Sequence, residues 1–303
     1  MTHSLYDVII IGGSYAGLSA AMALGRAGRK VLIIDSRLPC NRQTPHSHNF
    51  LTRDGETPAA IAAIAKEQVL QYPGVSYLQA KATAAQKHDN GFSLQTEAGD
   101  NYMAAKLLFA TGVLDQLPPI PGMADCWGIS VLHCPYCHGH EVRGQKTALL
   151  GSGAMAFHRA GLLRNWASEL VIYSNGPSGL EPEQLAQLQQ FHIPVIETPV
   201  QALEQAGGQL KAIVLEDGSR TAFAVAYANI ALEQHCTIPG TLGCSLTEQG
   251  LIQTEESGRT TDPDVFAAGD NSRMGRSVSI AVASGTMAGI TINNDLCAAA
   301  FRQ

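Results

Sequence analysis

Two cysteines and three histidines lie within the eight residues HCPYCHGH, positions 133–140. Cys134 and Cys137 are separated by two residues, which is the spacing of a redox-active disulfide. Cys134, Cys137 and His138 also match the attachment pattern of a c-type haem, and two thiolates with a neighbouring histidine could bind zinc. A fourth interpretation is a loop with buried, inert cysteines. The rest of the chain has to distinguish these four interpretations.

Composition and charge limit the class of protein. A chain of 303 residues is long enough for about two domains, and its hydrophobic content of 45% is that of a globular protein. The net charge of −6 gives no basic footprint, so we expect no nucleic-acid partner. The N-terminus, MTHSLYDVIIIGG, lacks the pattern of a signal peptide, and no apolar run reaches membrane-spanning length. We therefore expect a cytoplasmic protein without a membrane partner.

The number and spacing of the cysteines argue against a secreted disulfide framework. The chain has seven cysteines, Cys40, Cys126, Cys134, Cys137, Cys236, Cys244 and Cys297. Only Cys134 and Cys137 are closely spaced. An odd, scattered set is not the pattern of a small disulfide-stapled domain. A cytosolic Cys-x-x-Cys pair is more often metal-binding or catalytic than structural, and covalent haem normally requires export. Redox chemistry and zinc therefore stay open, with redox chemistry favoured.

A dinucleotide-binding unit is predicted at the N-terminus. Residues 6–11 (YDVIII) indicate a buried strand, the turn GGSYAG follows at 12–17, and a helix leads to a second strand at 30–35 (KVLIID). The helix N-terminus can bind a pyrophosphate, and Asp35 is placed to bind a ribose hydroxyl. Ser14 replaces the middle glycine of the usual motif, so its side chain has to point aside.

A second, altered copy of this unit is predicted in the middle of the chain. A strand at 146–150, the turn GSGAMA at 151–156 and a strand at 170–174 repeat the first copy, and a hairpin and strand follow each copy at 91–112 and 209–232. Ser174 stands where the first copy has Asp35, and residues 175–179 contain no Arg or Lys for a 2′-phosphate. NADP(H) binding is therefore doubtful. Arg159 and Arg164, on the helix of this copy, are either cofactor-binding residues or, in the simpler interpretation, part of a solvated helix face.

Three further motifs carry a resemblance to a known family. Ala110-Thr111-Gly112 closes the first long insert. The segment VFAAGD, residues 265–270, follows a Thr-Asp-Pro turn, and Arg276-Ser277-Val278 opens a helix. With the first glycine turn and the Cys-x-x-Cys pair, the chain resembles the low-molecular-weight thioredoxin-reductase family over nearly its whole length. We therefore predict an α/β fold of two Rossmann-like nucleotide-binding domains, the second inserted in the first. The FAD-binding domain is expected at 1–114 and 241–303, and the NAD(P)-binding-like domain with the Cys-x-x-Cys at 115–240.

The resemblance implies FAD as cofactor in the first domain and, by analogy, a homodimer. It implies that Asp270 and the turn 276–278 hold the ribityl chain and the isoalloxazine ring, and it places the segment around His48 beside the flavin. The residues expected to bind FAD are Gly12, Ser14, Tyr15, Ala16, Asp35, Ser36, Arg42, Gln43, Asn49, Ala82, Thr111, Gly112, Gly269, Asp270, Arg276, Ser277 and Val278.

Three details resemble one branch of this family. They are CPYCHG followed by Glu141, the glycine turn written GGSYAG, and SHNF at 47–50. The branch contains FAD-dependent dithiol oxidases that close disulfides in natural products of the gliotoxin and holomycin type. The resemblance implies that electrons pass to oxygen rather than arrive from NADPH, and the missing basic cluster after Ser174 agrees with it. The substrate is expected to be a small-molecule or peptide dithiol.

The resemblance assigns roles within the octapeptide. Cys137 is expected to face the flavin, and Cys134 to exchange with the substrate. Exchange requires a thiolate, and an ordinary cysteine pKa of about 8.5 leaves only a few per cent at pH 7. Thioredoxin reductases have an Asp after the second cysteine, whereas this chain has His138, whose neutral imidazole can take a thiol proton. The predicted catalytic residues are Cys134, Cys137, His138 and His140, and no metal site is expected.

Three functions follow from these observations. The leading hypothesis is an FAD-dependent dithiol oxidase. The second is an NADPH-dependent disulfide reductase of the thioredoxin-reductase type, and the third is a flavin redox sensor without turnover. Continuous consumption of oxygen with a dithiol supports the first, and cysteine-dependent consumption of NADPH supports the second. Stoichiometric reduction that stops supports the third.

Overall fold

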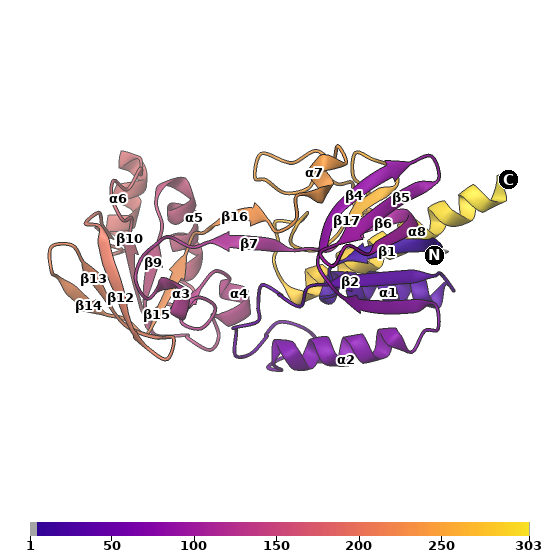
Figure 1. The fold of residues 1–303 in the computed structure, drawn as a ribbon. Coiled ribbons are helices and arrows are strands. Elements are labelled where there is room, and N and C mark those ends of the chain that lie inside the picture. The colour runs from indigo at the N-terminus through magenta and orange to yellow at the C-terminus, as the bar shows by residue number, and fades with distance from the viewer. Residues whose placement is uncertain (1–4, 303) are drawn as a thin grey trace. The chain divides into compact units, whose positions relative to one another are not determined.

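The computed structural model describes residues 5–302 and divides into two compact α/β units (Figure 1). Unit 1 consists of residues 1–42, 49–114 and 232–303, and unit 2 of residues 43–48 and 115–231. Residues 1–4 and 303, which the prediction assigns to the FAD-binding domain, lie outside the described residues. Each unit contains a β-α-β glycine-turn motif, so the repeat predicted from the sequence is present.

Unit 1 is built on a seven-stranded sheet with the order β3-β2-β1-β6-β5-β4, in which β17 also pairs with β6. Its strands are β1 (Leu5–Ile11), β2 (Val31–Asp35), β3 (Val75–Gln79), β4 (Ala82–His88), β5 (Gly91–Thr96), β6 (Asn101–Phe109) and β17 (Val265–Ala267). The central strands are parallel and in register, with Ile10 opposite both Ile33 and Leu108. The sequences of these central strands are near-continuous apolar runs, as expected for strands that are buried on both faces of a sheet.

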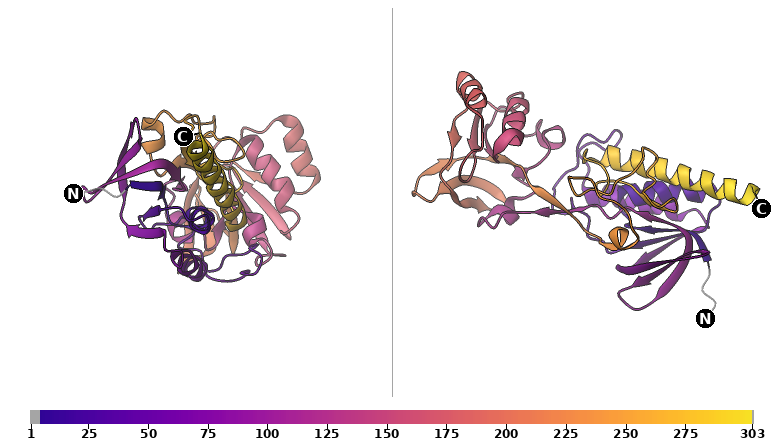
Figure 2. Two further views of the ribbon diagram at one scale, coloured as in Figure 1. Left: turned by 90° about the vertical axis from the view of Figure 1, so that its right-hand side faces the viewer. Right: turned by 90° about the horizontal axis from the view of Figure 1, so that it is seen from above.

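Three helices cover one face of this sheet: α1 (Tyr15–Arg26), α2 (Pro58–Leu70) and α8 (Val278–Phe301). Helix α8 lies along α1 (Figure 2). The contact is close because a Cβ atom on Gly285 would collide with the carbonyl oxygen of Ala16. The Ser19 hydroxyl of α1 also donates to the Val282 carbonyl of α8 at 2.8 Å. Helix α8 therefore braces the N-terminal half of α1, which follows the first glycine turn.

Unit 2 contains a five-stranded parallel sheet with the order β11-β10-β9-β15-β8. Its strands are β8 (Val131–Leu132), β9 (Lys146–Leu150), β10 (Glu169–Tyr173), β11 (Val195–Ile196) and β15 (Val225–Ala228). Helices α5 (Gly153–Leu163) and α6 (Pro182–Gln190) pack on one face. The other face is covered by α3 (Met123–Cys126) and an antiparallel sheet of β12 (Val200–Ala206), β13 (Gln209–Leu215) and β14 (Arg220–Ala222). The short helix α4 (Pro135–His138) follows β8 directly.

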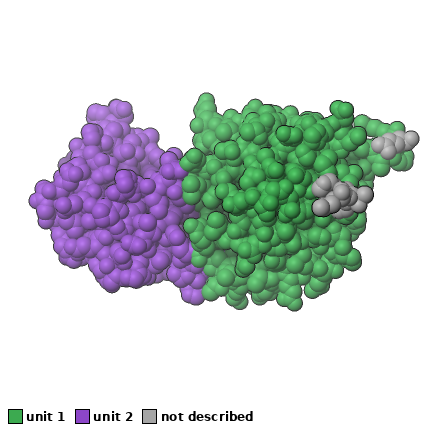
Figure 3. All heavy atoms as spheres, viewed as in Figure 1, with its two compact units in different colours: residues 1–42, 49–114, 232–303 green, residues 43–48, 115–231 purple. Residues whose placement is uncertain are grey.

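The unit boundaries differ in two places from the predicted domains (Figure 3). The chain returns to unit 1 after residue 231 rather than 240, because Ile238 of α7 (Ile238–Thr241) is buried in the core of unit 1. Residues 43–48 belong to unit 2, where the side-chain amide of Gln43 donates to the Trp127 carbonyl at 2.7 Å. Two connecting strands, β7 (Val113–Gln116) and β16 (Ala231–Gln234), pair with each other.

Among the helices formed by residues 5–302, none combines the length and the apolar character needed to span a membrane.

Substitution of Gly285 tests the contact between α1 and α8. Gly285→Ala should lower the free energy of unfolding by about 1–3 kcal/mol, because the added methyl group overpacks a backbone contact. Urea unfolding followed by circular dichroism measures the change. The matched control is Gly161→Ala in α5, where an added Cβ meets nothing within 4 Å. That variant should gain about 0.5–1 kcal/mol from helix propensity. Equal stability of the two variants would show that the Gly285 contact is not tight.

Candidate active site

The first glycine turn is shaped by contacts that only glycine can make. Gly12 has φ 104°, and a Cβ atom there would collide with the Ala110 carbonyl oxygen. A Cβ atom on Gly13 would lie 2.9 Å from the Cβ of Asp35. Ser14 precedes α1 in an extended conformation and makes no side-chain cap. The turn thus brings the backbone at the N-terminus of α1 against the ends of β2 and β6, where a pyrophosphate can approach it.

The predicted ribose-binding carboxylate has a partner that the sequence does not reveal. The Tyr77 hydroxyl donates to Asp35 Oδ2 at 2.6 Å, and the Lys66 ammonium lies 3.2 Å from the centre of the Tyr77 ring. Burial raises the pKa of Tyr77, and its hydrogen bond to Asp35 raises it further, so the phenol stays a donor. Tyr77 comes from β3 and Lys66 from α2, and only the pairing of β2 with β3 brings Tyr77 to Asp35. Tyr77 therefore orients the carboxylate that is predicted to bind ribose, and Lys66 packs on Tyr77.

Two residues that the sequence reasoning assigned to the cofactor help to build the start of α1. The Tyr15 hydroxyl is buried and donates to the Pro58 carbonyl at 3.2 Å, and it accepts a hydrogen bond from Asn41. Ala16 lies under Gly269, where an added Cβ would be 3.0 Å from the Ala16 methyl group. Both therefore pack the helix N-terminus into the unit.

The C-terminal motifs come together at the start of α8. The Arg276 Nε lies 3.3 Å from Asp270 Oδ2, and the Cys40 thiol donates to the same oxygen at 3.8 Å. The Ser277 hydroxyl accepts a hydrogen bond from the Ile280 amide at 3.2 Å and caps α8. The structure thus joins Asp270 to the 276–278 turn and brings Cys40, from a distant part of the sequence, to the same carboxylate.

Asn271 joins two of the predicted motifs. It is 0% exposed, and its side-chain amide donates to the Phe109 carbonyl at 2.9 Å and to the Thr111 hydroxyl at 3.3 Å. Gly112, the next residue after Thr111, has a left-handed φ of 65°. The Asn271 Oδ1 has no hydrogen-bond partner among the described residues. A buried acceptor without a donor, beside the left-handed turn at Gly112, fits a polar ligand such as FAD.

The other predicted cofactor residues of unit 1 occupy loops and element ends. Ser36 and Arg42 are exposed on the loop after β2, and Asn49 has a left-handed φ of 61°. Ala82 begins β4 and Val278 begins α8. Contacts of these residues with FAD remain predictions, as does the cofactor contact of Gln43, which lies in unit 2.

In unit 2, Cys134 and Cys137 form a disulfide, with Cα atoms 5.3 Å apart. Cys134 immediately precedes α4, and its sulfur accepts a hydrogen bond from the Cys137 amide at 3.2 Å. Pro135 begins the helix, where a missing N–H costs nothing. The turn closes at Gly139. Only glycine fits there, because a Cβ atom would collide with the Pro135 carbonyl oxygen and lie 2.9 Å from the Trp166 ring.

His138 is a partly buried imidazole next to the disulfide. Burial lowers the pKa of His138, and the charge of His48 lowers it further, whereas the Glu141 carboxylate acts in the opposite direction. The His48 and His138 rings meet edge to face with centroids 6.3 Å apart. His48 Nδ1 lies 3.6 Å from Glu141 Oε1. His138 is therefore neutral at pH 7 and able to accept a proton, while His140 is exposed.

Arg159 does not lie on a solvated helix face as the sequence suggested. Its Nη1 donates to the His133 carbonyl at 2.7 Å and to the Ala228 carbonyl at 3.3 Å, and burial lowers its pKa. Arg159 thus ties the residue before Cys134 to the end of β15. Helical spacing alone cannot show that Arg159 is partly buried while Arg164 is exposed. The Arg164 guanidinium stacks on the Phe191 ring.

The second glycine turn is covered by the loop that follows β10. The Gly153 amide donates to the Ser178 carbonyl at 2.7 Å, and the Ser178 amide donates to Glu197 Oε1 at 2.9 Å. The Ser174 hydroxyl donates to the Gly176 carbonyl at 2.6 Å, within the same loop. The amide at the position that corresponds to Ser14 of the first copy is therefore already hydrogen-bonded to protein.

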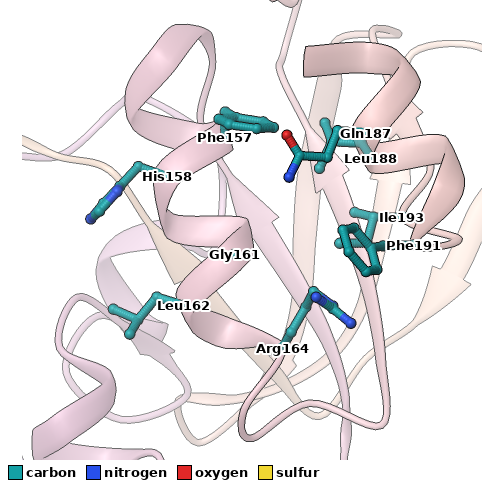
Figure 4. A pocket seen from close by; sticks show the side chains of 9 residues that line it. All are labelled: Phe157, His158, Gly161, Leu162, Arg164, Gln187, Leu188, Phe191 and Ile193. Atoms are coloured by element: carbon teal, nitrogen blue, oxygen red, sulfur yellow. The ribbon is translucent and has the colours of Figure 1, made fainter. Parts of the chain in front are cut away.

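A separate cavity of about 380 Å³ lies between α5 and α6. Apolar side chains, among them Phe157, Leu188 and Ile193, line it, and Arg164 stands at its edge with the guanidinium 3.8 Å from the Phe191 ring centre (Figure 4). None of the predicted catalytic or cofactor residues lines this cavity. In residues 5–302, no three His, Cys, Asp or Glu side chains are grouped so that they could hold a metal ion.

Comparison with known proteins identifies the family. The pyridine nucleotide-disulphide oxidoreductase family matches residues 6–285. The thioredoxin reductase tcpT of Claviceps purpurea is 32% identical, over 98% of this chain and 96% of that protein. The structure of a putative thioredoxin reductase TrxB from Bacillus anthracis has a TM-score of 0.92 at 32% identity, covering 96% of this chain and 98% of that one. The structure of HlmI has the same TM-score and identity, covering 100% of this chain and 97% of that one.

The fold and the matches define a flavin-dependent disulfide oxidoreductase. The chain belongs to the pyridine nucleotide-disulphide oxidoreductase family, in its thioredoxin-reductase-like group, and its cofactor is FAD. The predicted fold class, the family resemblance and the cofactor are thereby confirmed.

Substitutions at Asp35 and Tyr77 test the adenosine end of the FAD site. Asp35→Ala should weaken FAD retention by roughly 10- to 150-fold, because a charge-assisted hydrogen bond to ribose contributes about 1.5–3 kcal/mol. Tyr77→Phe should weaken it less, since the carboxylate stays but loses its 2.6 Å donor. Absorbance of released flavin against protein, after dialysis, measures retention. Tyr102→Phe on β6 is the control and should retain FAD like the wild type. Full retention in Asp35→Ala would remove Asp35 from the site.

Proposed function

We propose that this chain is an FAD-dependent dithiol oxidase that closes a disulfide in a small-molecule or peptide substrate, with oxygen as the final electron acceptor. The observation that carries the proposal is the covered second glycine turn. The Gly153 amide, which would face a nucleotide phosphate in an open turn, is bonded to the Ser178 carbonyl. A chain that cannot take electrons from NADPH needs another donor, and a dithiol at the cysteine pair supplies one.

The electrostatics of the covering loop support the same direction. Hydrogen bonds from the Ser178 hydroxyl and amide lower the pKa of Glu197, so this side chain is an anion at neutral pH. An NADPH phosphate approaching the loop would meet this carboxylate and no arginine or lysine within residues 174–179. Like charges oppose such an approach, and the loop would also have to give up its own hydrogen bonds.

The cysteine pair performs the proposed exchange. A substrate thiolate attacks Cys134 Sγ, the bond between Cys134 and Cys137 breaks, and Cys137 leaves as a thiolate. The second substrate thiolate then attacks the substrate sulfur bound to Cys134, which releases the substrate disulfide and the Cys134 thiolate. Two electrons have passed from the substrate to the cysteine pair, and two thiol protons have been given up. FAD, when bound, supplies two-electron acceptor chemistry that regenerates the disulfide.

His138 supplies the base for this exchange. A neutral imidazole beside the disulfide can take the proton of an incoming thiol at pH 7, when few free thiols are ionised. Its lowered pKa keeps the imidazole in the base form under mildly acidic conditions. The Cys137 amide, 3.2 Å from Cys134 Sγ, stabilises the negative charge that this sulfur acquires when the substrate disulfide is released.

One observation favours the opposite direction, a disulfide reductase that draws on NADPH. The Asn229 side chain lies against Gly151 of the second turn, and both its nitrogen and its oxygen are buried without a hydrogen-bond partner in the described part of the chain. A polar ligand at this turn would satisfy them. The two directions make different predictions about which compound reduces the protein.

Anaerobic reduction distinguishes the two directions. Dithiothreitol should bleach the 450 nm absorbance of the purified holoprotein, and admitted oxygen should restore the colour. NADPH and NADH, in separate experiments, should bleach it poorly, because the Gly153 amide is already bonded. Cys134→Ser and Cys137→Ser should each abolish multiple turnover of dithiothreitol, since exchange requires both sulfurs. Rapid, saturable bleaching by micromolar NADPH would establish the reductase, and bleaching without oxygen-driven recovery would establish a sensor.

The pH dependence of turnover tests His138. Because its pKa is lowered below about 6.5, the imidazole should remain neutral at pH 6.5, and the rate should fall only at more acidic pH. His138→Gln should slow oxygen consumption with dithiothreitol by roughly 10²–10⁴ at pH 6.5, and less at pH 9, where substrate thiols ionise without help. Initial rates between pH 5.5 and 9.5 give both profiles. A constant ratio between the two proteins at every pH would assign His138 a structural role only.

A further inference from the structure

We propose that His48 and Glu141 form a proton relay that carries the substrate protons from His138 to solvent. The inference rests on the proposed dithiol chemistry at Cys134 and Cys137 and adds two residues to it. Both lie in unit 2 together with the disulfide, although residues 43–48 reach this unit from a distant part of the sequence.

The geometry orders the three side chains. The His48 and His138 rings are perpendicular, with centroids 6.3 Å apart, so an edge of one ring faces the other. His48 Nδ1 lies 3.6 Å from Glu141 Oε1. The side-chain exposure increases toward the carboxylate, from 19% for His48 to 39% for Glu141. A proton that reaches His48 is thus next to an anion that contacts solvent.

The charges around His48 favour this direction of transfer. Its facing titratable groups are His138, Glu141 and His46, whose ring centroid is 6.4 Å away. Burial destabilises the charged form of His138, and the charge of His48 adds to this effect, so His138 readily gives up a proton toward the more exposed side, where Glu141 Oε1 lies 3.6 Å from His48 Nδ1. Burial raises the pKa of the Tyr227 phenol and the Glu141 charge raises it further, so Tyr227 stays protonated and does not compete for the proton.

The proton balance requires such an exit. Each substrate thiol that ionises gives one proton to a base, and each dithiol gives two for every disulfide that it closes. His138 can hold only one proton, so it must release the first before it accepts the second. Transfer to His48, directly or through one solvent molecule, resets His138, and Glu141 stabilises the transferred charge until it leaves. No electron moves in this step, and no bond other than those to hydrogen changes.

The test is anaerobic single-turnover reduction of the holoprotein by dithiothreitol, followed at 450 nm in stopped flow between pH 6 and 9. His48→Gln should lower the rate about 10-fold at pH 6.5 and little at pH 9, and Glu141→Gln should lower it about 3-fold at pH 6.5. Added imidazole should restore most of the rate of His48→Ala. His46→Gln is the matched control, a neighbouring histidine outside the relay, and should keep the wild-type profile.

Two outcomes would overturn the relay. One is a His48→Gln profile that coincides with that of His46→Gln at every pH. The other is a loss in His48→Gln of equal size at pH 6.5 and pH 9 without rescue by imidazole in His48→Ala, which would mean that His48 only supports the structure. Failure of the proposed function gives a different result. The wild type would then consume no oxygen with dithiothreitol, while the His48-dependent opening of the disulfide would persist in the single-turnover measurement.

Discussion

The close contact between a glycine turn and the end of a neighbouring parallel strand sets the backbone geometry of the ligand-facing edge in each half of this molecule. In unit 1, Gly12 lies against the carbonyl of Ala110. In unit 2, Gly151 lies against the side chain of Asn229. The same β-α-β geometry exposes helix N-terminal amides in both, because parallel strands end at the same edge of a sheet. What differs is whether another part of the chain already bonds to those amides.

That difference arises from short loops rather than from the fold. After β2, Asp35 is held by the Tyr77 hydroxyl and remains at the end of the strand. After β10, Ser174 begins a loop that hydrogen-bonds to itself, and Ser178 reaches back to Gly153. The Gly153 amide needs one acceptor, and a carbonyl of the same chain is always present whereas a nucleotide has to bind from solution. Unit 2 can therefore keep the nucleotide-binding fold and use its carboxyl edge to hold the cysteine pair, which Arg159 fixes through the His133 carbonyl.

The sequence predicts the parts of this arrangement that depend on local pattern. Apolar runs followed by glycines locate β1 and β9, and the spacing of Cys134 and Cys137 indicates their disulfide. It does not predict partners that meet only through sheet register or chain crossing, such as Tyr77 with Asp35. The boundary predicted near residue 240 lies nine residues beyond the end of unit 2 at residue 231 for the same reason, since Ile238 packs into a core that no local pattern marks. Arg159 was misplaced because helical spacing gives its position on α5 but not the carbonyls that its guanidinium meets.

The proposed chemistry at the disulfide depends on keeping a base neutral where substrate thiols must lose protons. Burial, and then the charge of His48, lower the pKa of His138 and keep its imidazole in the base form. Glu141 opposes that effect, and His48 stands beside both groups. A carboxylate in direct contact with His138 would hold the proton there and block a second transfer. In the proposed relay the Glu141 carboxylate acts together with His48, which receives the proton of His138 and draws it away from the sulfur atoms.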